Sequence, residues 1–65
     1  MQNYQFETKI GFRSYKFEAV NDHSAIAYAE KTAGDTLLVL YIEDPLAGKS
    51  GLRIVADYRK GLMAW

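Results

Sequence analysis

The stretch YKFEAVNDHSA, from Tyr15 to Ala25, contains the change from strand to helix on which the fold prediction depends. Its first part alternates, with Tyr15, Phe17 and Ala19 on one face and two charged residues on the other, which is typical of a half-buried strand. Asn21 follows, and its side-chain oxygen can accept a free backbone N–H two or three residues later. We therefore expect a strand to end near residue 19 and a helix to begin just after Asn21.

The segment before this stretch alternates in the same way, with aromatic and β-branched residues on one face from Tyr4 to Ile10. Gly11 breaks the pattern, and we expect residues 11–14 to connect the two strands. Alternating segments around a short glycine-containing link predict an antiparallel hairpin with one solvated face. On that face we expect charged side chains to pair across the strands: Glu7, Lys9, Lys16 and Glu18.

The helix is predicted over residues 22–33. Its apolar residues recur at helical spacing, and Gly34 follows as the expected C-terminal stop because glycine readily adopts a left-handed conformation. A stripe rich in alanine lets the helix lie close on a sheet. The stripe contains Ala25, Ile26, Ala29 and Ala33.

Two further strands are predicted after the helix. Residues 36–43 carry apolar side chains on both faces, and their length, β-branching and flanking glycine and proline favour a strand over a buried helix. Residues 44–51 contain one proline and two glycines and predict a loop. Residues 52–58 alternate again and predict a fourth strand, with Ile54 on the same face as Ala56 and Tyr58. Residues 62–65 form either a short fifth strand or an apolar tail.

This order, β-β-α-β-β, predicts a single α+β domain over residues 1–65, with one helix on a four- or five-stranded antiparallel sheet. A domain of 65 residues buries only about 60% of the surface of its unfolded chain, and the absence of cysteine excludes a disulfide. Such a fold has a small margin of stability. We expect the core to contain Tyr4, Phe6, Phe17, Ala25, Ala29, Val39 and Ile54.

The composition narrows the classes of function. Eight Lys and Arg balance eight Asp and Glu, which excludes an acidic DNA mimic and argues against direct binding of nucleic acid as the main activity. The longest apolar run is too short to span a membrane, and the N-terminus carries no basic region followed by an apolar stretch. We expect a cytoplasmic protein with no membrane partner.

No constellation of catalytic residues is visible. His23 is the single histidine; it falls in the first turn of the predicted helix and is interpreted as a surface residue. The neighbouring Glu43 and Asp44 point in different directions along a strand, and Gly48-Lys49-Ser50 lacks the earlier glycine and the following helix of a phosphate-binding loop. We therefore predict that the protein is not an enzyme and has no catalytic, cofactor-binding or metal-binding residues.

The sequence supplies more apolar surface than one helix on a sheet can cover. The third strand has apolar side chains on both faces, and the chain ends on Leu62-Met63-Ala64-Trp65. This tail either folds back on the open sheet face or forms an intermolecular surface, and both interpretations stay open. Binding energy concentrates in aromatic and arginine anchors, so the predicted partner-binding residues are Arg53, Tyr58, Arg59, Lys60 and Trp65. If the tail is not involved, the alternative surface is the hairpin face with Lys9, Arg13 and Lys16.

The stretch from Tyr15 to Ala25, the β-β-α-β-β order and the C-terminal Tyr58-Arg59-Lys60-Gly61 with Trp65 resemble those of small phage-encoded anti-CRISPR proteins that block type I surveillance complexes. The resemblance implies a non-enzymatic inhibitor that binds Cas subunits and occludes the path of target DNA along the guide RNA. No motif fixes the contact residues of that family, so none are transferred to this chain.

We therefore expect a phage-encoded, protein-binding inhibitor that acts in the host bacterial cytoplasm. Its expected partner is a larger protein or ribonucleoprotein complex, with Cas subunits as the suspected target. The alternative is a small homodimeric nucleic-acid-binding or regulatory domain. A third class, a subunit of a multicomponent enzyme, is also left open by the sequence.

Overall fold

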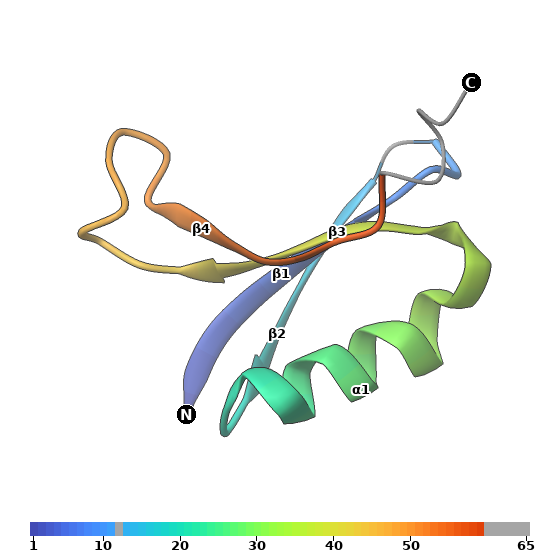
Figure 1. The fold of residues 1–65 in the computed structure, drawn as a ribbon, viewed down its shortest axis with the longest axis horizontal. Coiled ribbons are helices and arrows are strands. Elements are labelled where there is room, and N and C mark those ends of the chain that lie inside the picture. The colour runs from blue at the N-terminus through green and yellow to red at the C-terminus, as the bar shows by residue number, and fades with distance from the viewer. Residues whose placement is uncertain (12, 60–65) are drawn as a thin grey trace.

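Four antiparallel strands form one sheet, and a single helix packs on one of its faces (Figure 1). The computed structural model describes residues 1–11 and 13–59. The elements are β1 (Gln2–Thr8), β2 (Ser14–Ala19), α1 (Asp22–Ala33), the 3-10 turn η1 (Gly34–Thr36), β3 (Leu37–Glu43) and β4 (Leu52–Asp57). The strands lie in the order β2-β1-β3-β4. The predicted α+β class and element order are confirmed, while the segment 62–65 lies outside the described residues.

Both ends of α1 follow from local chemistry. Asn21 has an extended backbone, and its side-chain oxygen accepts a hydrogen bond from the N–H of Ser24 at 2.8 Å. At the other end Gly34 has a φ of 55°, and its N–H donates to the carbonyl of Glu30. The predicted cap and stop are therefore confirmed. In the described part of the chain, no helix has the length and apolar character needed to cross a membrane.

The main core lies between α1 and the sheet. Of the residues predicted to form it, Tyr4, Phe6, Ala25 and Ala29 are fully buried there, and Phe17 is partly buried against them. Val39 is also buried as predicted, but it lies outside this cluster on the other face of the sheet. The cluster is completed by Ala19, Leu37, Leu40 and Ile42.

The prediction that Ile54 belongs to the core is wrong, because 47% of its surface is exposed. The register between β3 and β4 shifts after Ile54: this residue lies opposite Tyr41, whereas Ala56 lies opposite Leu40. Val55 is the extra residue, and such a bulge reverses the alternation of side chains. Ile54 therefore lies on the open face, while Val55 and Ala56 both pack against the core.

The charged residues of the hairpin do not pair with one another, contrary to expectation. None of Glu7, Lys9, Lys16 and Glu18 forms an ion pair with another described residue. The register explains this result, because the positions that face the two β2 charges across the strands carry neutral side chains of β1. Lys16 and Glu18 are left exposed on the solvated face.

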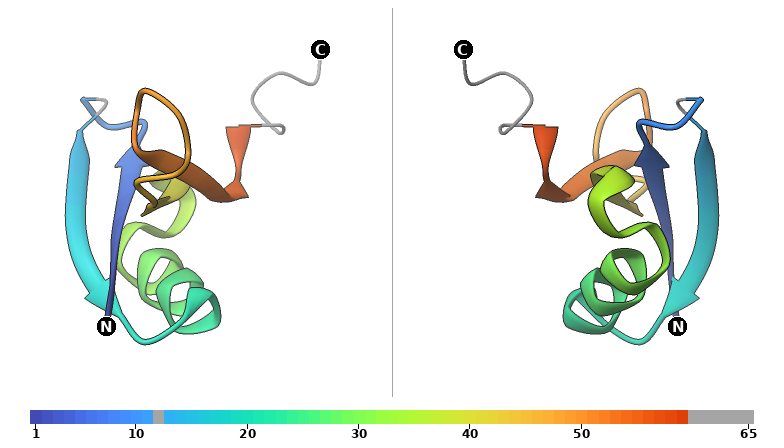
Figure 2. Two further views of the ribbon diagram at one scale, coloured as in Figure 1. Left: turned by 90° about the vertical axis from the view of Figure 1, so that its left-hand side faces the viewer. Right: turned by 90° about the vertical axis from the view of Figure 1, so that its right-hand side faces the viewer.

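Two tyrosine hydroxyls from the sheet side of the molecule donate hydrogen bonds to carboxylates of the helix. Tyr4, on β1, donates to Asp22 at 2.8 Å in the first turn of α1. Tyr58, just after β4, donates to Glu30 at 2.9 Å near the end of the helix. Burial, and then the bond to Asp22, raise the pKa of Tyr4. Figure 2 shows the result from both sides: α1 covers one face of the sheet, and β2 forms an outer edge.

Candidate functional site

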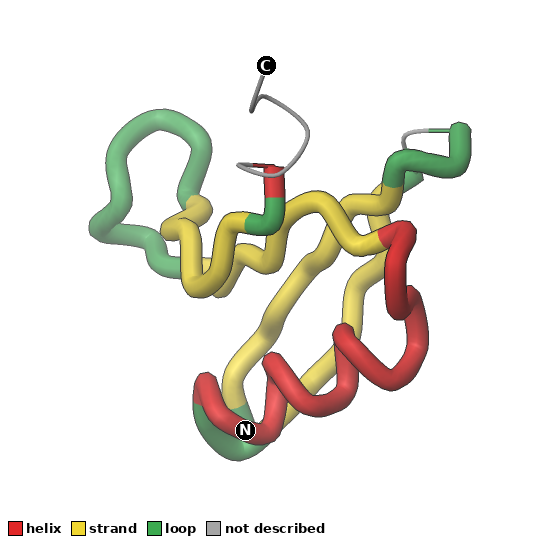
Figure 3. The backbone as a smooth tube through the Cα atoms, turned by 45° about the vertical axis from the view of Figure 1, so that its right-hand side comes forward, coloured by secondary structure: helices red, strands yellow, loops and turns green. Residues whose placement is uncertain are grey.

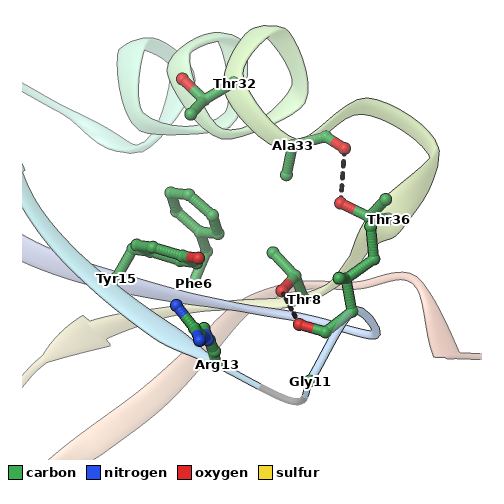
Figure 4. A pocket seen from close by; sticks show the side chains of 9 residues that line it. Phe6, Thr8, Gly11, Arg13, Tyr15, Thr32, Ala33 and Thr36 are labelled. Atoms are coloured by element: carbon green, nitrogen blue, oxygen red, sulfur yellow. Dashed lines mark hydrogen bonds between the residues drawn. The ribbon is translucent and has the colours of Figure 1, made fainter.

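The end of the β1–β2 hairpin lies close to the C-terminal end of α1 and the turn η1 (Figure 3). Residues of these segments line an open cleft. Its volume is about 470 Å³. Residues of the hairpin form one wall and residues of the helix end form the other (Figure 4). The described lining residues are Phe6, Thr8, Ile10, Gly11, Arg13, Tyr15, Thr32, Ala33 and Thr36.

Backbone hydrogen bonds hold the two walls together. The N–H of Thr8 donates to the carbonyl of Arg13 at 3.0 Å and closes the hairpin. The N–H of Lys9 donates to the carbonyl of Thr36 at 2.8 Å and ties the hairpin to η1. Gly11 lies in the turn between β1 and β2 and has a φ of 69°, a backbone conformation that residues with a Cβ rarely adopt. The walls of the cleft are therefore fixed by main-chain bonds on both sides.

The interior of the cleft is largely apolar. Phe6, 2% exposed, belongs to the core, and the ring of Tyr15 stacks on it with centroids 5.2 Å apart. Tyr15 remains 44% exposed, and Ile10 at the hairpin end is 67% exposed. These residues offer a binding partner an aromatic and an aliphatic contact next to each other.

The aromatic surface continues beyond the cleft along β2. Phe17 packs between Phe6 and Tyr28, and its centroid lies 4.5 Å from that of Tyr28 on α1. Tyr28 is 48% exposed. We call Tyr15, Phe17 and Tyr28 the aromatic row. It joins the cleft to the middle of the helix along the side of the molecule that carries β2.

The polar groups of the cleft differ in their availability. The hydroxyl of Thr8 donates to the carbonyl of Ile10 at 3.3 Å, and that of Thr36 donates to Ala33 at 2.7 Å, so both donors are already used (Figure 4). Arg13 is exposed, is the one charged residue of the described lining, and forms no ion pair with a described residue. The cleft is therefore suited to an apolar group that carries a carboxylate or another anion.

The described lining of this cleft contains no histidine, cysteine, aspartate or glutamate. His23 lies in the first turn of α1, roughly 13 Å along the helix axis from Thr32. Among residues 1–11 and 13–59, no three His, Cys, Asp or Glu residues come together as a group that could hold a metal ion. The cleft thus offers contacts for binding rather than a nucleophile paired with a base.

The structure describes three of the five residues that the sequence predicts as a partner surface, and each of the three has a contact within the chain. Arg53 lies on β4 with its Nε 3.5 Å from Asp44, and half of its side chain is exposed. Tyr58 packs on the core, and burial followed by its bond to Glu30 raises its pKa to about 12. Lys60 and Trp65 lie outside the described residues, so they cannot be placed beside the others.

Arg59 is the fifth of these predicted residues, and it is engaged within the chain. Its guanidinium donates to both carboxylate oxygens of Asp57, at 3.0 and 2.8 Å. These bonds lower the pKa of Asp57 to about 2. Close by on the open face, burial and then the neighbouring Glu7 raise the pKa of Tyr41. The predicted surface is therefore divided, with Tyr58 against the helix side of the sheet and Arg59 in a polar group with Asp57.

No protein-family model matches the chain, and no curated protein or solved structure matches it significantly. The candidate site therefore depends on geometry alone. Sequence reasoning missed the cleft as a site, although Arg13 belongs to the alternative hairpin surface. One feature of the sequence indicates the cleft: the apolar alternation of β1 continues to Ile10, two residues past the end of the strand at Thr8.

Proposed function

We propose that the protein is a non-enzymatic binding protein that acts by occupying a surface of a larger protein assembly. One observation carries the proposal: Tyr15, close to half exposed, lines a cleft whose described lining has one cation and no acid, and the aromatic row continues from it to the half-exposed Tyr28. Tyrosine and arginine are enriched among the residues that dominate binding energy at protein interfaces. The cleft and the aromatic row supply both kinds of residue on one side of the molecule.

The cleft sets the chemistry of the partner. Its volume lies in the range of sites that enclose a side chain or a small ligand. An apolar side chain of the partner would pack on Phe6 and Tyr15, and a neighbouring carboxylate would reach the guanidinium of Arg13. We therefore propose an acidic, apolar segment of a protein as the contact.

The stretch from Tyr15 to Ala25 and the element order resemble those of small anti-CRISPR proteins. This resemblance supports a more specific version of the proposal. In this version the protein is phage-encoded and blocks a CRISPR–Cas surveillance complex by covering a surface of a Cas subunit. A domain of 65 residues can inhibit by covering a surface, because occlusion needs no catalytic group.

A purified type I surveillance complex provides the direct test. We expect the protein to bind the complex and to prevent binding of target DNA. Arg13→Glu should weaken binding at least about tenfold, since it replaces attraction to a carboxylate with repulsion. Lys49→Glu is the matched control, because it makes the same change of charge on an exposed loop outside the described lining of the cleft.

Several results would count against the proposal. If Arg13→Glu and Tyr15→Ala both bind as the wild type does, the cleft is not the contact surface. If the protein does not bind the surveillance complex but is captured on another bacterial complex through the cleft, the specific version is wrong and the general one stands. Melting temperatures measured on the same variants separate loss of binding from loss of fold.

The alternative function, a small nucleic-acid-binding domain, would use some of the same residues in a different way. Tyr15 can stack on a base, and Arg13 with the exposed Lys9 and Lys16 can contact phosphates. Binding to a single-stranded oligonucleotide that falls steeply with salt concentration would support this nucleic-acid-binding domain over the protein inhibitor.

A further inference from the structure

The outer edge of β2 is a second surface, which adjoins the cleft at Tyr15. In the described sheet β2 is an edge strand, and its six residues pair with β1 without any shift of register. It contains neither proline nor glycine. The opposite edge strand, β4, is interrupted by the bulge at Val55. A regular, unprotected edge is the kind that accepts another strand.

The hydrogen bond between the Thr8 N–H and the Arg13 carbonyl sets the phase of the β2 backbone. In an antiparallel ladder, pairs that exchange hydrogen bonds alternate with pairs that do not. Counting along the register from Arg13, Tyr15 and Phe17 direct their backbone groups toward β1. Lys16 and Glu18 therefore direct their N–H and carbonyl groups outward, away from the sheet.

We propose that a second copy of the chain pairs antiparallel with this edge, about a two-fold axis beside Phe17. In this arrangement Lys16 lies opposite Glu18 of the second copy, and Glu18 lies opposite Lys16 of the second copy. Both pairs are hydrogen-bonded through their outward backbone groups. Two sheets of four strands join into one of eight, and two opposite-charge pairs form on the solvated face.

The charges select this register. A shift of the pairing in one direction places Lys16 opposite Lys16 of the second copy, and a shift in the other places Glu18 opposite Glu18. Like charges directly opposite are destabilising. Registers in between place outward backbone groups opposite groups already bonded to β1. The absence of an ion pair to Lys16 or Glu18 among the described residues leaves both charges available for this contact.

The helix side of β2 fits the same pairing. Phe17 lies opposite Phe17 of the second copy in a pair without hydrogen bonds, where side chains approach most closely. Tyr28 stacks on Phe17 and is 48% exposed, and Tyr15 is 44% exposed. In Figure 2, α1 does not extend past β2, so the helix leaves this side of the strand accessible. Pairing would bury aromatic surface that the single chain leaves in water.

Charge exchange provides the test. Lys16→Glu and Glu18→Lys each turn two attractive pairs into two repulsive ones, and we expect each to weaken dimerisation about tenfold in sedimentation. The double variant K16E/E18K restores opposite charges and should return the dissociation constant to near the wild-type value. Lys31→Glu, exposed on α1, is the control for the change in net charge.

Amide hydrogen exchange locates the interface. As the protein concentration rises, the amides of Lys16 and Glu18 should become protected, while those of Tyr15 and Phe17 are protected at every concentration. A wild-type chain that stays monomeric at millimolar concentration would overturn the proposal. A dimer that ignores the single changes, or that the double variant fails to restore, would overturn it as well. The two proposals share Tyr15, Phe17 and Tyr28, but their tests are separate: the charge exchanges at Lys16 and Glu18 test the edge, whereas Arg13→Glu tests the cleft.

Discussion

Replacing Tyr58 by phenylalanine tests whether this residue holds the helix in place. The change removes the hydroxyl that donates to Glu30 at 2.9 Å and keeps the ring that packs on the core. Glu30 is exposed and regains water, so the loss is that of one hydrogen bond, about 1 kcal/mol at neutral pH. For a domain of this size, that lowers the melting temperature by about 4–8 °C.

The pKa of Tyr58 makes this loss depend on pH. Burial, and then Glu30, raise it to about 12, compared with about 10 for an ordinary tyrosine. Because the folded-state pKa is the higher one, the stabilisation is complete below pH 10 and is lost as the pH rises through 12. Because this hydroxyl is partly exposed, solvent screening keeps the loss below the about 2–3 kcal/mol that the full shift would give. The stabilities of wild type and Tyr58→Phe should therefore converge near about pH 11.

Urea unfolding followed by far-ultraviolet circular dichroism measures both effects in one series of pH values. Tyr15→Phe is the matched control, since it removes a hydroxyl from a ring that is 44% exposed. A gap between wild type and Tyr58→Phe that stays constant from neutral pH to about pH 11 would refute the pKa argument. Equal stabilities at neutral pH would show that the bond to Glu30 does not hold the helix.

Three further results are expected. Asn21→Ala should cost about 0.5–2 kcal/mol of unfolding free energy in urea titrations, and Asn21→Ser should recover most of it. Asp57 should titrate with a pKa of about 2 in carbon-detected NMR, and this pKa should move toward its ordinary value in Arg59→Gln. The stabilisation that the Asp57–Arg59 pair gives the fold is present above the unfolded pKa and disappears as the pH falls toward 2. Ile54→Lys should leave the melting temperature nearly unchanged, whereas Val55→Lys should lower it clearly, in contrast to simple alternation.

The elements of the fold were predictable because their signals are local. The cap at Asn21 depends on a bond three residues away, and the stop at Gly34 depends on a left-handed φ. Alternation from Tyr4 to Ile10 indicated the first strand, although the strand spans Gln2–Thr8 and ends two residues before Ile10. Each of these signals lies within one turn of helix or one pair of strands, so no knowledge of distant contacts was needed.

The cleft could not be predicted in the same way, because it forms between segments that are distant in sequence. Arg13 and Thr32 line it together, yet nothing in either segment indicates the other. The bond from Lys9 to Thr36 that joins the walls is equally invisible in a local pattern. Sequence reasoning located the residues of the hairpin but not the wall that the end of α1 provides.

The bulge at Val55 explains why simple alternation fails along β4. Simple alternation gives Ile54 and Tyr58 one face and leaves Asp57 on the other, as if β4 were a regular strand. With the extra residue, Ile54 and Asp57 share the open face, and Tyr58 reaches the helix. Residues that are close in sequence therefore serve the stability of the fold on two faces.

The two halves of the sheet differ in how many of their side chains have partners within the chain. β3 is the most buried strand, and the segment after β4 is held by hydrogen bonds and an ion pair within the chain. Four of the six residues of β2 are exposed, and its two charged side chains form no ion pair with a described residue. A chain of 65 residues has a small core, and an exposed aromatic ring adds nothing to the apolar surface that it buries. A second molecule that covers the β2 side would recover that burial, so the argument for binding and the argument for stability point to the same half of the molecule.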